Sequence, residues 1–155
     1  MMFRTHVLFG ILCGLLALLF FDPKMPWVFF GFFVVGAMMP DIDIPNSKVG
    51  RRHRVMSLFT NFVFGHRGFI HTIYPALGLF VLFYVLGFGG LGFALFLGYF
   101  SHLILDMLTP DGIAFFYPLY NVRMKGFVHT AGVLEYLVQV FVIVGVVVVV
   151  RFGWF

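Results

Sequence analysis

Five apolar segments make up most of this chain, and they decide what it can fold into. They cover about residues 7–21, 26–39, 69–86, 92–108 and 131–150. The chain is 62% hydrophobic and 10% charged, whereas a soluble domain carries about 25% charged residues. The first two segments fall short of the roughly 20 residues that span a bilayer, so we expect them to be tilted or to form a hairpin. The sequence predicts an all-α, polytopic integral membrane helical bundle with about five transmembrane helices, in one domain over residues 1–155.

The basic residues predict how this bundle is oriented. Cytoplasmic loops of membrane proteins carry an excess of Lys and Arg. Five crossings from a cytoplasmic N-terminus leave only Lys24 and Arg151 outside. The other eight of the ten basic residues then lie inside: Arg4, Lys48, Arg51, Arg52, Arg54, Arg67, Arg123 and Lys125. We therefore predict a multi-pass protein of the cell membrane with a cytoplasmic N-terminus. The net charge of +4 is explained by topology and contact with lipid headgroups, so no nucleic-acid partner is expected.

An imidazole and a carboxylate stand four residues apart at the end of the fourth apolar segment. In a helix, His102 and Asp106 lie on one face, one turn apart. Ionisable groups inside a membrane segment are costly, and they usually face the bundle interior and have a function. A buried pair that only ties helices together is the alternative interpretation.

Further histidines and carboxylates are expected on the same, cytoplasmic side, because alternating helices bring their segment ends together there. His6 opens the first helix, Asp41 and Asp43 follow the second, His66 and His71 enter the third, and His129 and Glu135 enter the fifth. Mixed imidazole and carboxylate ligands suit zinc, manganese or iron. More than four ligands would allow two metals. Asp41 and Asp43 could instead end a helix, and Glu135 and His129 could be structural.

Four motifs occur in order along the chain. They are Thr5-His6, Pro40-Asp41-Ile42-Asp43 with Ser47, the run from Gly65 to Thr72, and the run from Ser101 to Gly112. In this order the chain resembles the LexA-regulated, membrane-bound predicted metal-dependent hydrolases, over nearly all of residues 6–118. The resemblance implies a small inner-membrane protein whose metal site is built from His6, Asp41, Asp43, His66, His71, His102 and Asp106.

A looser likeness is to zinc-dependent phospholipases C, helical enzymes that hold several zinc ions with His and Asp. His102 and Asp106 match the histidine–acid pairs of those enzymes, one helical turn apart. His129 and Glu135 are six residues apart and do not match. This departure favours one or two metals over three, with zinc preferred and manganese as an alternative.

The function that we predict is metal-dependent hydrolysis of a lipid-like ester, with a phosphoester favoured, at the cytoplasmic membrane boundary. The expected metal ligands are His6, Asp41, His71, His102, Asp106 and Glu135. Asp43 or His66 would transfer protons, and Arg67 would grip a phosphate in bidentate fashion. Two alternatives stay open at this point. One is a carrier for divalent metal ions or protons, and the other is a non-catalytic scaffold with a structural metal.

Overall fold

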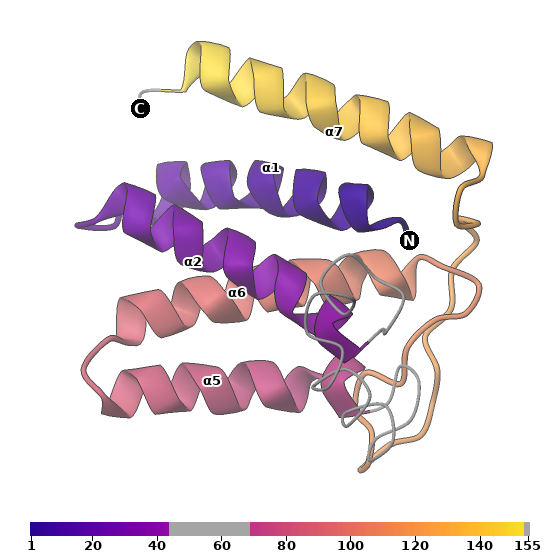
Figure 1. Cartoon of the computed structure of the whole chain (residues 1–155), viewed down its shortest axis with the longest axis horizontal. Coiled ribbons are helices and arrows are strands. Elements are labelled where there is room, and N and C mark those ends of the chain that lie inside the picture. Colours follow the sequence, from indigo (N-terminus) through magenta and orange to yellow (C-terminus); the bar gives the residue numbers. More distant parts are fainter. Residues whose placement is uncertain (44–68, 154–155) are drawn as a thin grey trace.

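The regular secondary structure in the described part of the chain is helical. The computed structural model describes residues 1–43 and 69–153, and Figure 1 shows its helices. The α-helices are α1 (Phe3–Phe21), α2 (Pro26–Met38), α5 (Ile73–Val85), α6 (Gly89–Met107) and α7 (Val133–Phe152), with short 3₁₀ helices η1 (Met39–Asp43) and η2 (Phe69–His71). Within these ranges, β structure is limited to one isolated bridge between Ile113 and Met124. The predicted all-α bundle of about five helices is confirmed.

Three of these helices are long and apolar enough to cross a membrane: α1, α6 and α7, with 19, 19 and 20 residues. The other two, α2 and α5, have 13 residues each and are shorter than a simple crossing requires. The shortness of α2 agrees with the sequence, and that of α5 differs from the longer segment expected there. The described helices therefore combine full-length spans with shorter apolar helices packed against them.

Helix α6 is the centre of the bundle. It packs against α2, α5 and α1, whereas α7 packs mainly on α1. Successive helices alternate in direction, so the start of α1, the end of α2, the start of α5, the end of α6 and the start of α7 lie at one end (Figure 1). This is the convergence of segment ends that the sequence led us to expect.

Small residues allow the close approach of α2 and α6. A Cβ placed on Gly98 would collide with the carbonyl of Phe33, and one on Gly36 would collide with the carbonyl of Leu95. Helices in membranes commonly pack through such small residues, because the backbones can then touch. The contact matters for the site, because His102 lies one turn after Gly98 on α6 and Ala37 directly follows Gly36 on α2.

Two helix boundaries differ from expectation. Helix α1 begins at Phe3, so His6 lies inside the helix instead of at its start. The sequence predicts a tight turn of Gly87, Gly89, Gly90 and Gly92, but helix α6 begins at Gly89, so only Gly87, with φ of 83°, lies in the turn itself. Gly92 is helical and needed for space, since a Cβ there would lie 2.6 Å from the Cβ of Phe83.

Candidate metal centre

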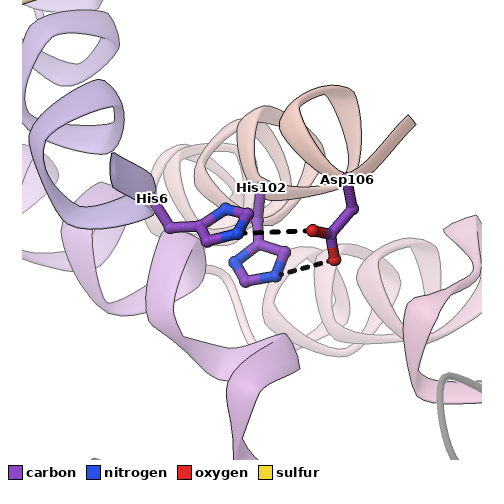
Figure 2. A group of neighbouring side chains, drawn as sticks. All are labelled: His6, His102 and Asp106. Carbon is purple, nitrogen blue, oxygen red and sulfur yellow. Dashed lines mark ion pairs between the residues drawn. The ribbon is translucent and has the colours of Figure 1, made fainter. Parts of the chain in front are cut away.

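The carboxylate of Asp106 is surrounded by three imidazoles at the convergent end of the bundle. Its Oδ1 lies 3.3 Å from His6 Nε2, and its Oδ2 lies 3.4 Å from His71 Nε2 and 3.5 Å from His102 Nε2. All four side chains are at most 3% exposed. The amino group of Met1 also lies 3.2 Å from Oδ1. Figure 2 shows His6 and His102 directed at different oxygens of Asp106.

These separations fit the edges of a metal coordination shell better than direct hydrogen bonds. Charge-assisted N–H···O bonds are about 2.7–2.9 Å long, shorter than all three histidine–Asp106 distances. Ligands about 2.0–2.1 Å from a tetrahedral zinc are about 3.3 Å from one another. His6, His102 and Asp106 each offer a ligand atom, and the three atoms lie within 4.8 Å of one another. The rings of His6 and His102 are stacked at 3.8 Å, which directs two imidazoles to one place.

The orientation of His102 is fixed from the opposite side of its ring. Its Nδ1 lies 2.8 Å from the carbonyl oxygen of Ala37 on α2. A carbonyl can only accept, so Nδ1 carries the proton, and Nε2 of the neutral ring presents a lone pair toward Asp106. A lone pair facing a carboxylate needs a cation between them, either a proton or a metal. A histidine held through its second nitrogen by a backbone carbonyl is the common arrangement of metal ligands.

His71 and Asp41 reach the same end from the short 3₁₀ helices. His71 ends η2 and is fully buried, and the hydroxyl of Tyr99 on α6 donates to the carbonyl of Ile70 just before it. Asp41 lies in η1 and is 6% exposed. It is close enough to His71, His102 and Asp106 to interact with them electrostatically. A second carboxylate beside the cluster would balance the charge of a divalent ion bound by neutral imidazoles.

Comparison with known proteins assigns the chain to a family. The model of a family described as YdjM inner membrane protein matches residues 1–154. The chain belongs to this family. The match supports a location in the inner membrane, in agreement with the apolar helices. The description mentions neither LexA regulation nor hydrolysis, so those parts of the resemblance stay predictions.

Individual relatives of this YdjM-family protein come from several bacteria. The chain is 33% identical to the uncharacterized protein YvsG of Bacillus subtilis over 142 residues, covering 87% of this chain and 85% of that one. It is 35% identical to the inner membrane protein YdjM of Escherichia coli over 91 residues. This match covers 55% of this chain and 46% of the Escherichia coli protein. The match to YdjM of Shigella flexneri has the same values. The chain thus matches about half the length of these YdjM proteins. No solved structure matches it.

Glu135 of this YdjM-family protein has hydrogen-bond partners of its own. Its Oε1 accepts from the backbone N–H of Met2 and the hydroxyl of Thr5, both at 2.6 Å, and its Oε2 accepts from the N–H of Ala131 at 2.7 Å. Both oxygens are therefore engaged with α1 and with the start of α7. Because these hydrogen bonds occupy its carboxylate, we propose no metal-ligand role for Glu135. His129 is exposed.

Three predicted residues are only partly covered or not covered by the structure. Asp43 ends η1, but its side chain is outside what the structure describes. His66 and Arg67 lie outside the described residues. Their proposed roles in proton transfer and phosphate binding rest on the sequence alone.

Other residues shape the cluster although the sequence pattern did not single them out. Ala37 orients His102 through its carbonyl, and Tyr99 anchors the segment before His71. The hydroxyl of Thr109 donates to the carbonyl of Asp106 at 2.8 Å and closes the end of α6. Backbone carbonyls leave no signal in a sequence, but Gly36-Ala37 opposite Gly98 is a small-residue pattern that indicates close helix contact.

Proposed function

We propose that this protein is a membrane-embedded metal-dependent hydrolase that acts on a lipid-like ester, with a phosphoester favoured. The observation that carries the proposal is the buried Asp106 carboxylate with three imidazole nitrogens 3.3–3.5 Å away. Three histidines around one carboxylate cannot all be protonated at an acceptable cost in a buried site. A shared divalent cation satisfies their lone pairs together.

The donor set favours a transition metal. Imidazole nitrogens and carboxylate oxygens suit zinc, with manganese as an alternative, whereas magnesium and calcium prefer oxygen ligands. We propose His6, His71, His102 and Asp106 as ligands, with Asp41 as a further ligand or as the charge partner. The two oxygens of Asp106 are near different histidines, which suits either one ion or a carboxylate shared by two.

The protein's own residues would then serve binding and orientation. When bound, such a metal supplies an activated water and polarises a phosphoryl oxygen. Ala37 holds the His102 ring in one tautomer, and burial around Asp106 excludes bulk water. Asp43 or His66 would carry protons, and Arg67 would grip a phosphate, as proposed from the sequence.

A lipid-like substrate is supported by the surroundings of the cluster. An apolar groove of about 710 Å³ lies between α1, α6 and α7. Leu105 of α6 and Leu108, which follows the end of α6, line it together with Leu134 and Phe141 of α7. Leu105 directly precedes Asp106. An acyl or isoprenoid chain in this groove would bring its headgroup to the histidines. We propose that this end faces the cytoplasm, from the distribution of Lys and Arg.

One observation favours a second candidate, a structural metal centre. The histidines and Asp106 are almost fully buried, as expected for a closed site that only pins α1, η2 and α6 together. An enzyme must admit a substrate to the same position. Only an assay of turnover separates the two.

The test is hydrolysis by purified protein in nanodiscs, loaded with zinc. Two phosphomonoesters, phosphatidic acid and an isoprenoid phosphate, would be offered in long-chain and short-chain forms, and release of inorganic phosphate would be measured. A phosphodiester lipid and a carboxylic ester lipid would be tested in parallel. For these two, release of the headgroup or of the fatty acid would be measured. We expect turnover that a chelator abolishes, that zinc restores and that favours long chains. Stoichiometric zinc in folded protein with no hydrolysis of any of these esters would contradict the enzyme and establish the structural centre.

A further inference from the structure

A buried hydrogen-bond network joins α7 to the first turn of α1 beside the candidate metal centre. Glu135 is fully buried, and its oxygens accept from Met2, Thr5 and Ala131 at 2.6–2.7 Å. The amide of Gln139, one turn later on α7, donates to the hydroxyl oxygen of Thr5 at 2.8 Å. The Thr5 hydroxyl thus both donates and accepts, and it is 0% exposed.

The positions of two helix starts explain why a carboxylate belongs here. Met2 precedes α1 as its N-cap, and Glu135 lies in the first turn of α7. Helix N-termini have unsatisfied N–H groups and a partial positive charge, both of which favour an anion. The Met2 side chain makes no capping hydrogen bond. Glu135 supplies the missing acceptor from a helix that is distant in sequence.

This network contributes much of the buried contact that attaches α7 to the rest of the bundle. Among the described elements, α7 packs mainly on α1 and lies beside it at the edge of the bundle (Figure 1). Most of the apolar side chains of α7 are exposed. Of the α7 residues, only Glu135 and Val142 are buried. The hydrogen-bond network of Glu135 therefore fixes the position of the start of α7 relative to the start of α1.

The same turn of α1 carries a proposed metal ligand. Thr5 is bonded to Glu135 and Gln139, and the next residue, His6, has Nε2 3.3 Å from Asp106. We infer that Glu135, acting through the Thr5 hydroxyl, is a positioning residue that holds His6 at the metal centre. The inference rests on the proposed metal site, and it assigns Glu135 and Gln139 of α7 a role in that site without contact to the metal.

The experiment compares Thr5→Val with Thr5→Ser in otherwise intact protein. Valine has the shape of threonine without its hydroxyl, whereas serine keeps the hydroxyl. Val142→Ala is the matched control, because it loosens a buried α7 residue two turns after Glu135 and leaves the network intact. The readouts are affinity for Co²⁺ with its visible absorption spectrum, and the ¹⁵N resonances of the His6 imidazole in metal-free protein.

We expect Thr5→Val to weaken Co²⁺ binding about 10-fold or more and to shift the His6 resonances, as loss of outer-sphere partners does. Thr5→Ser should restore both, and Val142→Ala should change neither, even where it lowers thermal stability equally. If Thr5→Val does not fold, Glu135→Gln serves the same comparison. Equal effects of Val142→Ala and Thr5→Val, or wild-type values in Thr5→Val, would overturn the inference. A wild type that binds no metal would refute the proposed metal site. The His6 resonances of metal-free protein would still test whether the network positions the His6 ring.

Discussion

Replacing Asp106 with Asn is expected to abolish metal binding while leaving the bundle folded. Asn has nearly the same shape, but it loses the charge and replaces one acceptor oxygen with an NH₂ group. His6 lies near Oδ1, and His71 and His102 lie near Oδ2. In either orientation of the amide, its NH₂ group therefore faces at least one imidazole nitrogen. Loss of an outer-sphere partner already costs about 10–100-fold in affinity, so we expect a loss above about 100-fold, measured by competition with a zinc chelator.

Asp22→Asn is the matched control for this substitution. Asp22 is exposed at the other end of α1, with φ of 39°, a left-handed conformation that Asn also tolerates. It should bind zinc like the wild type. If Asp106→Asn keeps wild-type affinity, Asp106 is not a ligand and the proposed site is wrong.

Replacing Gly98 with Ala is expected to cause the largest loss of stability. The added Cβ would collide with the carbonyl of Phe33, and it would lie 2.9 Å from the N of Ala37. Both are backbone atoms and cannot turn away as a side chain can. Overpacking usually costs about 1–3 kcal/mol, occasionally more, and we expect the upper part of that range or failure to fold. Because Ala37 also orients His102, metal affinity should fall in any protein that does fold. Thermal unfolding in detergent measures the first effect.

Gly31→Ala tests the same change without the collision. Gly31 lies on α2, and a Cβ there would meet nothing within 4 Å. Alanine favours a helix over glycine by up to about 1 kcal/mol, so this variant should be as stable as the wild type or slightly more stable. Equal stability of Gly98→Ala and the wild type would show that α2 and α6 are not packed as described.

The helices and the end of the bundle that carries the site could be predicted because their causes are local. The composition of each apolar segment predicts a helix. Because successive helices alternate in direction, their polar ends come together. That reasoning placed His102 and Asp106 one turn apart, and it expected His6 and His71 at the same end. The described contacts bring these four side chains together.

Boundaries and partners depend on distant contacts, so the sequence could not provide them. The sequence starts the first apolar segment at about residue 7, but α1 begins at Phe3, where Glu135 accepts from the N–H of Met2, 133 residues away. Gly92 seemed to belong to a turn, although its lack of a side chain lets α6 approach Phe83. The partners of Glu135 likewise depend on the packing of α7 against α1, which the sequence does not specify.

Metal content of the wild-type protein tests the central claim most directly. Protein purified in detergent without chelators would be measured by elemental mass spectrometry. We predict about one or two zinc or manganese ions per chain. Less than about a tenth of an ion per chain, in protein that is folded and stays metal-free after incubation with zinc and manganese, would contradict a metal centre around Asp106.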